Sequence, residues 1–254
     1  MKNYQYHLLL IFLFSTVSIG SADDTLLVTH ENILITTEKV STSIPKQISF
    51  TVPDILDTIY AAILRGEYPS VIKDAESLKN TITDEETVYI LDYFTAIAHY
   101  NILLRNHIYN VETRSKSRIL AEELFHNTSQ HVKDPQVAGR SLIWYAMTMH
   151  ISYTDYNNKK KAIDALNEIA SRRFEDTGLS DDAIFIKARI YMDIGWYGSA
   201  RHYFKKLLSK DHSGNILFDP WRNEYRGAPE AAANALSELR RICVPQKEND
   251  LSVN

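Results

Sequence analysis

The sequence predicts an all-α protein. Only 8 glycines and 7 prolines occur in 254 residues, whereas barrels, sandwiches and nucleotide-binding α/β folds need many Gly-dependent turns and phosphate loops. From Pro53 onward the apolar residues recur at helical spacing, and capping residues precede several of these runs. The formal net charge of −4, with 24% charged residues, fits a folded globular chain. It argues against nucleic-acid binding, because domains that bind nucleic acid are basic.

Residues 1–22 have the order of a secretory signal peptide. Lys2 precedes an apolar run over residues 8–14, and small residues follow, so cleavage is expected after Gly20 or Ala22. The run is shorter than the roughly 20 residues of a spanning helix, and an uncleaved N-terminal anchor is the alternative. No Cys lies near the cleavage positions, which excludes bacterial lipoprotein attachment. We therefore expect an exported protein, periplasmic or else secreted, that is at most peripheral to a membrane.

Residues 23–52 are expected to form an extended N-terminal arm. Leu26, Val28 and His30 alternate with Leu27, Thr29 and Glu31, apolar and polar residues alternate over 48–52, and residues 33–37 are rich in β-branched side chains. Three such short strands cannot make an independent sheet. The segment is therefore expected to lie on the helical body, or to form a hairpin that pairs with another chain.

About nine helices are expected between residues 53 and 243, in antiparallel pairs joined by short loops, followed by a disordered tail over 244–254. Each start is marked by a capping residue, a proline or first-turn acidic residues. Helix starts are expected at Pro53, at Asp134 before Pro135, and at Ser180 before Asp181 and Asp182. A capping box of Thr83 and Glu86 is expected to start a helix that ends near Leu104. Ala228 before Pro229 is expected to start a last helix that ends near Cys243.

Two segments share one spacing of small, aromatic and glycine residues. In each, the first helix ends at a glycine, whose backbone has more conformational freedom than that of other residues. Small residues let two antiparallel helices approach closely. The later run is Ala188, Tyr191, Gly195, Tyr197, Ala200, Phe204 and Leu207, and the earlier is Ile59, Ala62, Gly66, Tyr68, Val71, Ala75 and Leu78. The glycines lie further apart than three steps of about 34 residues, so insertions are expected at 104–116 and 153–160.

With this spacing the sequence resembles the tetratricopeptide repeat family, whose helix–turn–helix unit has about 34 residues. The later copy departs from the family pattern, with Ile184 and Lys187 where Trp and Leu are usual and His212 where a closing Pro is usual. The resemblance implies an α-solenoid of about four helix hairpins plus a closing C-terminal helix over residues 53–243. It also implies a groove, lined by the first helix of each hairpin, for an extended peptide or a partner helix.

The resemblance places two sets of residues in the groove, and a third set is typical of a binding hot spot. The first hairpin would contribute Leu56, Tyr60 and Ile63, and the last would contribute Phe185, Arg189 and Met192. Packing against the N-terminal arm is the alternative for both sets. Trp221, Arg222 and Arg226 lie in a loop before the last helix, and Trp and Arg are enriched at hot spots. Anchoring of that loop to the body by Trp221 is the alternative.

The chain contains no recognisable motif for catalysis, nucleotide binding or zinc. There is no His-Glu-x-x-His, P-loop or Gly-x-Ser-x-Gly pattern, and no Cys/His pair has zinc spacing. His126 and His131 are expected in a polar loop. Adjacent carboxylates such as Asp181 and Asp182 are expected to be solvated or first-turn charges, because adjacent positions diverge on a helix.

Four further expectations concern single residues and one charged run. Gly139 and Gly198 lie inside predicted helices, where small size is expected to serve packing. Cys243, the single cysteine, excludes an internal disulfide and is expected to be a small buried residue, a reactive or intermolecularly paired thiol being the alternative. Residues 159–161, three lysines, are expected to be a solvated helix start, or else a contact for an acidic partner.

These observations predict a non-catalytic scaffold or adaptor that binds an unidentified protein partner in cell-envelope assembly, with no catalytic residue, cofactor or metal. The alternative is a small-ligand-binding accessory component of an envelope transport system. A closed apolar cavity would favour the alternative, whereas an open groove of mixed charge would favour the adaptor.

Overall fold

The computed structural model describes residues 52–152, 155–169, 174, 178–222 and 224–243. The predicted signal peptide (1–22), the predicted arm up to residue 51 and the predicted tail (244–254) lie outside the described residues. Within them the chain forms nine α-helices and one small antiparallel sheet of two strands. The predicted all-α class is confirmed at this level.

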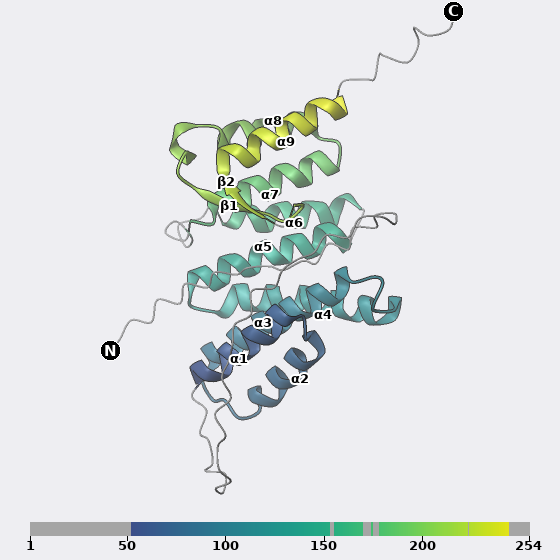
Figure 1. Ribbon diagram of the computed structural model, residues 1–254, viewed down its shortest axis with the longest axis vertical. Coiled ribbons are helices and arrows are strands. Elements are labelled where there is room, and N and C mark those ends of the chain that lie inside the picture. Colours follow the sequence, from purple (N-terminus) through teal and green to yellow (C-terminus); the bar gives the residue numbers. More distant parts are fainter. Residues whose placement is uncertain (1–51, 153–154, 170–173, 175–177, 223, 244–254) are drawn as a thin grey trace, which may run out of the picture.

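The helices are stacked along the long axis of the molecule, from α1 and α2 at one end to α8 and α9 at the other (Figure 1). A short 3-10 turn and the two strands lie between α8 and α9 in the sequence. The bounds are α1 Val52–Arg65, α2 Tyr68–Lys79, α3 Glu85–Leu104, α4 Val111–His131, α5 Pro135–Ser152, α6 Tyr156–Glu168, α7 Ser180–Asp193, α8 Tyr197–Leu207, the 3-10 turn Lys210–His212, β1 Ile216–Asp219, β2 Glu224–Gly227 and α9 Ala228–Cys243.

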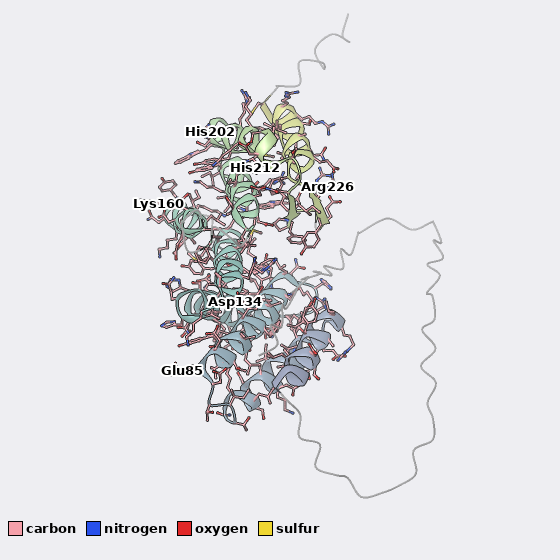
Figure 2. The ribbon with its side chains drawn as sticks, turned by 90° about the vertical axis from the view of Figure 1, so that its left-hand side faces the viewer. Glu85, Asp134, Lys160, His202, His212 and Arg226 are labelled. Carbon is pink, nitrogen blue, oxygen red and sulfur yellow. The ribbon has the colours of Figure 1, made fainter. Side chains whose placement is uncertain are left out.

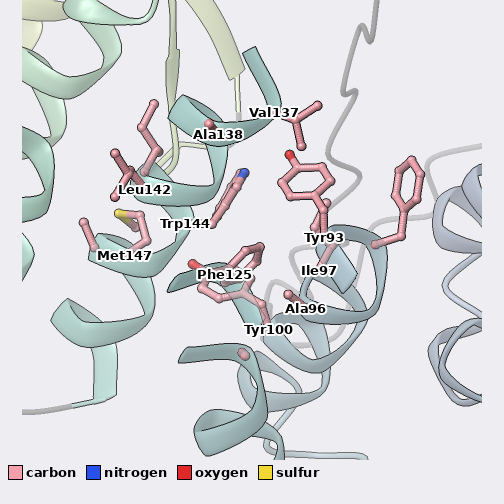
Figure 3. Close-up of a cluster of buried hydrophobic side chains, with 14 of the residues drawn as sticks. Tyr93, Ala96, Ile97, Tyr100, Phe125, Val137, Ala138, Leu142, Trp144 and Met147 are labelled. Carbon is pink, nitrogen blue, oxygen red and sulfur yellow. The ribbon is translucent and has the colours of Figure 1, made fainter. Parts of the chain in front are cut away.

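Each helix packs against its neighbours in the sequence. The odd-numbered helices also contact one another in order, α1 with α3, α3 with α5, α5 with α7 and α7 with α9. As a result α3 and α5 are surrounded, and residues 91–102 of α3 are all buried. Figure 3 shows Tyr93 and Ile97 of α3, Phe125 of α4 and Trp144 of α5 gathered in this central core. A second cluster of buried side chains joins α7, α8, β1 and α9.

The two glycine turns predicted from the shared spacing have the same backbone structure. Gly66 and Gly195 have φ angles of 76° and 81°, a left-handed conformation that is costly for any residue with a Cβ. At both turns the glycine N–H donates to the carbonyl three residues earlier, and the next N–H donates to the carbonyl five residues earlier. This pair of bonds is the Schellman helix ending.

Asp134 caps α5 as predicted, because its carboxylate accepts hydrogen bonds from the N–H groups of the second and third residues after it. The predicted caps of α3 and α7 are wrong. At α3 the cap is Asp84, whose carboxylate accepts from the Thr87 N–H at 2.9 Å. The Glu86 carboxylate instead accepts from the N–H groups of Lys133 and Asp134, and so ties the α4–α5 turn to α3. Ser180 is the first residue of α7, and no side chain caps that helix.

The expected insertions at 104–116 and 153–160 are also wrong. Helix α4 starts at residue 111 and α6 at 156, so both connections are short. The additional length lies mainly in the helices, since α3, α4 and α5 have 20, 21 and 18 residues. Helices α1, α3, α5 and α7 start at residues 52, 85, 135 and 180, and only the first of these spacings is close to 34.

Residues 216–227, expected to be a loop in part, form a β-hairpin that lies against α7. Strand β1 pairs with β2 from Ile216 opposite Gly227 to Asp219 opposite Glu224. Asp182 accepts from the Phe218 N–H at 2.9 Å, and Asp181 accepts from the Asn215 side-chain amide at 2.8 Å. These carboxylates are first-turn charges of α7, one of the two expectations, and they are structural contacts of the hairpin and not solvated groups.

Candidate functional site

The three residues predicted for the groove of the last hairpin lie beneath α9. Phe185 is fully buried and Met192 is 5% exposed, both in the cluster shared by α7, α8 and α9. Their predicted position in an open groove is wrong, because the closing helix covers them. Arg189 is also buried, and its guanidinium donates to Glu238 of α9 at 2.6 Å.

The residues of the predicted hot spot have three different environments. Trp221 is half-buried, with Arg189 over its ring at 5.0 Å and the His150 ring at 5.9 Å, as expected for the alternative in which it anchors the hairpin to the body. Arg222 is exposed and lies 3.9 Å from Asp219. Arg226 pairs with Glu224 of β2 and Glu230 of α9, at 2.7 Å and 3.3 Å.

The residues predicted on the first hairpin pack toward α3. Ile63 is 8% exposed and belongs to the central core, and Leu56 and Tyr60 are partly buried against the same core. The Tyr60 ring lies 6.4 Å from that of Phe94. The structure therefore does not bring the two predicted halves of the groove together as one open surface.

A group of three titratable side chains, two of them buried, joins α5, α6 and α7. The Lys159 amine lies 3.0 Å from His150 Nδ1 and also donates to the His150 carbonyl, while His150 Nε2 lies 2.8 Å from Asp193 Oδ2. An ammonium can only donate, so Nδ1 accepts and Nε2 carries the proton that faces Asp193. Burial lowers the pKa of Lys159, and the Asp193 carboxylate opposes this effect.

This group corrects the expectation that Lys159 is solvated, because Lys159 and His150 are 9% and 7% exposed. Neither side chain lines either of the two hollows described below, and their contacts tie three helices together. No local signal identifies it, since the residues come from three separate helices and the pairing depends on how those helices stack.

A small hollow between α5, α7 and the hairpin contains a second buried carboxyl group. It measures about 20 Å³, and Arg140, Trp144, Asp182 and Tyr225 are among the residues that line it. A space of this size holds about one water molecule. Burial raises the pKa of Asp182 to about 6, although the Phe218 N–H and the Arg140 charge both favour its ionised form.

The most exposed aromatic group in the described part of the chain is a row of stacked rings across α6, α7 and α8. We call Tyr156, Tyr191, Trp196 and Tyr203 the aromatic surface. Its consecutive ring centroids are 5.5, 5.7 and 5.6 Å apart in the order Tyr156, Trp196, Tyr191 and Tyr203. Tyr156 and Trp196 are 53% and 45% exposed, and the Lys187 ammonium lies 4.2 Å from the centre of the Tyr203 ring.

An open hollow of about 240 Å³ adjoins the aromatic surface. Tyr203, Lys187, Lys206 and Asn167 are among its lining residues, and the Lys187 ammonium also donates to the Asn167 side-chain oxygen. Helix α8 carries basic residues in its last turn and has no acidic residue. The rings, the amide and the two lysines together form an accessible surface of mixed apolar and cationic character.

Three other predicted positions differ from expectation. His126 and His131 lie on α4, not in a loop; the His126 ring is tilted against that of Tyr145 and the His131 ring stacks on that of Tyr89, each at 5.2 Å. Cys243 is exposed, so the prediction of a buried residue is wrong.

Comparisons with known proteins do not assign a family, because no family model, curated protein or solved structure matches the chain. Among the described residues, no three His, Cys, Asp or Glu side chains are grouped so that they could hold a metal ion. None of the helices in that part of the chain combines the length and the apolar character needed to cross a bilayer.

Proposed function

We propose that this chain is an exported, non-catalytic scaffold or adaptor that binds a protein partner in the cell envelope through the aromatic surface. The observation that carries the proposal is the exposure of Tyr156 and Trp196 in a row of rings that already contact one another, with Trp196 stacked on Tyr191. Trp and Tyr dominate protein-binding hot spots. Rings held in place before binding lose little conformational entropy when a partner covers them.

We also propose that the helices form four tetratricopeptide-like hairpins, α1–α2, α3–α4, α5–α6 and α7–α8, closed by α9. The matching Schellman turns at Gly66 and Gly195 support this arrangement, as do the contacts between successive odd-numbered helices. The unequal spacing of the helix starts is a departure from the regular repeat. The proposed binding surface lies on α6, the end of α7 and α8, because α9 covers the first helix of the last hairpin.

Export is proposed from the signal-like order of residues 1–22, with the periplasm as the compartment and secretion as the alternative. The proposed role requires no cofactor and no catalytic residue. The His150–Lys159–Asp193 group is compatible with this view, since His150 and Lys159 are buried and each polar atom described above has a partner.

The second candidate, a small-ligand-binding component of envelope transport, has less support. Ligand pockets in proteins usually measure about 300–1,000 Å³ and are mostly enclosed. The two hollows described above measure about 20 and 240 Å³. The larger one is open and lined by lysines, as expected for a surface that binds a protein.

A site-specific crosslinking experiment tests the proposal. A photoreactive amino acid is placed at Trp196 in the full chain, and at Ile119 of α4 as a control of similar exposure, 52% against 45%. Illumination in cells, or in an envelope extract, is expected to give a discrete protein adduct from position 196 and none from position 119. The proposal is wrong if position 196 gives no adduct, or if a tightly bound small molecule accompanies the purified chain without any protein.

A further inference from the structure

We propose that copies of this chain associate head to tail, with the α8–α9 end of one copy docking on the α1–α2 end of the next. The two ends lie at opposite extremes of the stack of helices (Figure 1). In the side view, Glu85 lies near one end and His202 of α8 near the other (Figure 2). This proposal does not depend on the proposed function, although Lys206 of α8 belongs both to the basic end defined below and to the hollow beside the aromatic surface.

The α8–α9 end carries unpaired positive charge. Arg201, Lys205 and Lys206 of α8, and Arg240 and Arg241 of α9, are exposed; we call these five residues the basic end. None of them pairs with a carboxylate of the described residues. The acidic residues of α9 are engaged elsewhere, since Glu230 pairs with Arg226 and Glu238 with Arg189. Asp211 is the exposed minority charge at this end.

The α1–α2 end carries the opposite charge. Asp57 of α1, Asp74 and Glu76 of α2 and Glu85 of α3 are exposed; we call these four residues the acidic end. Asp74 accepts a hydrogen bond from Ser70, and none of the four has an ion-pair partner among the described residues. Two of the nearby cations are already paired, Arg65 with Glu67 and Lys79 with Asp92, which leaves Lys73 as the exposed minority charge.

A second copy is the occupant that these two surfaces fit, because each end carries the charge that the other lacks. Complementary potentials guide association and fix the orientation of partners, whereas like charges oppose the wrong orientation. Two basic ends, or two acidic ends, therefore repel each other. Different surfaces meeting head to tail leave a free end on each side, so the association continues into short chains of molecules rather than closing as a dimer.

The expected association is weak and sensitive to salt. Helices α1 and α2 have 14 and 12 residues, or about 20 Å each at 1.5 Å per residue. The contact between two such hairpin faces therefore falls at the lower end of the size range of specific interfaces. The charges are exposed, so raising the ionic strength screens their attraction.

Sedimentation velocity of the purified full chain tests the proposal without any other protein. At about 20 mM salt the weight-average sedimentation coefficient is expected to rise with protein concentration between about 10 μM and 1 mM, and at about 300 mM salt the rise is expected to vanish. Replacing Arg240 and Arg241 together by Glu is expected to weaken the association at least tenfold. The matched control replaces the exposed Lys160 and Lys161 of α6 by Glu, which changes the net charge equally and leaves the association intact.

A second pair of substitutions distinguishes a head-to-tail contact from other contacts. The variant Glu76→Lys/Glu85→Lys damages the acidic end and is also expected to remain monomeric. Mixing it with Arg240→Glu/Arg241→Glu is expected to restore association, because each variant retains the end that the other lacks. Assembly in the mixture is expected to stop at dimers when only one interface forms. Far-UV circular dichroism checks that both variants are folded.

The proposal is overturned if the unmodified chain remains monomeric at 1 mM protein in low salt. It is also overturned if the damaged variants associate as the unmodified chain does, or if the mixture of folded variants stays monomeric. None of these results depends on whether position 196 captures a protein partner, so failure here and failure of the proposed function are separate outcomes.

Discussion

Replacing the two turn glycines by alanine tests the reasoning about the repeated helix ending. Gly66 and Gly195 have nearly equal φ angles, 76° and 81°, but different surroundings. A Cβ at Gly195 would meet nothing within 4 Å, whereas a Cβ at Gly66 would lie 3.3 Å from the Arg105 guanidinium. That guanidinium lies 4.8 Å from the centre of the Tyr68 ring and donates to the Tyr68 hydroxyl at 3.2 Å.

The expected losses follow from these contacts. Gly195→Ala costs only the left-handed backbone conformation, about 1 kcal/mol of the free energy of unfolding. Gly66→Ala also forces the Arg105 guanidinium to shift by a few tenths of an ångström, which weakens its cation–π contact and hydrogen bond with Tyr68, each of which contributes about 0.5–1 kcal/mol. The expected loss at Gly66 is therefore about 2 kcal/mol. Gly198, within α8 and with open space around it, is the control: Gly198→Ala is expected to stabilise the protein by about 0.5 kcal/mol.

Urea unfolding followed by far-UV circular dichroism gives the free energy of unfolding of the three variants and the unmodified chain. The expected order of stability is Gly198→Ala, the unmodified chain, Gly195→Ala and then Gly66→Ala. Full stability of Gly195→Ala would refute the argument from the turn. Equal losses at Gly66 and Gly195 would refute the part assigned to Arg105.

Three further predictions concern packing, a buried hydroxyl and two titrating groups. Gly139→Ala is expected to cost about 1–3 kcal/mol in urea unfolding, because its Cβ would lie 2.7 Å from Leu179 Cδ1; a stable variant would contradict this. Tyr68→Phe is expected to cost about 1 kcal/mol and leave Asn101 without a donor, whereas Tyr197→Phe, at the matching but exposed position, should cost nothing measurable. Burial raises the pKa of Asp182 to about 6, whereas burial, with the Lys79 charge as a smaller cause, lowers that of His99 to about 4. Asp182 therefore loses its stabilising effect as pH rises from about 4 to 6, and His99 loses its own as pH falls from about 6.5 to 4. Between pH 4 and 7 the two effects on the free energy of unfolding nearly offset each other. Asp182→Asn removes one of them, so the free energy of unfolding of this variant should rise by about 3 kcal/mol from pH 4 to 7. If the variant and the unmodified chain give parallel profiles of stability against pH, the offset is absent.

Much of the fold could be predicted because its signals are local. The helical class, the cap at Asp134 and the last helix from Ala228 to Cys243 depend on residues within about one turn of each other. The glycine turns are of the same kind, since a left-handed residue after an amphipathic run ends a helix whatever packs on it. Gly139 serves packing as predicted, whereas Gly198 has open space around it.

The candidate site could not be predicted in the same way. The expected groove residues Phe185 and Met192 have the right helical positions, but α9 folds back from far along the chain and buries them. The repeat spacing includes Tyr191 but does not predict the aromatic surface. Its rings come from three helices, and only the approach of α6 to α7 places Tyr156 beside Trp196.

By itself the sequence determined that this protein is helical, where five of the helices begin to within about two residues, where α3 and α9 end, and that two hairpins share a glycine ending. These properties follow from backbone sterics and side-chain periodicity, which act over a few residues. Only the tertiary structure decided which polar groups are buried, that α9 closes the last hairpin, and that the rings of α6, α7 and α8 stack at the surface. Burial and stacking depend on contacts between helices that are distant in the sequence, and those contacts leave no local pattern to read.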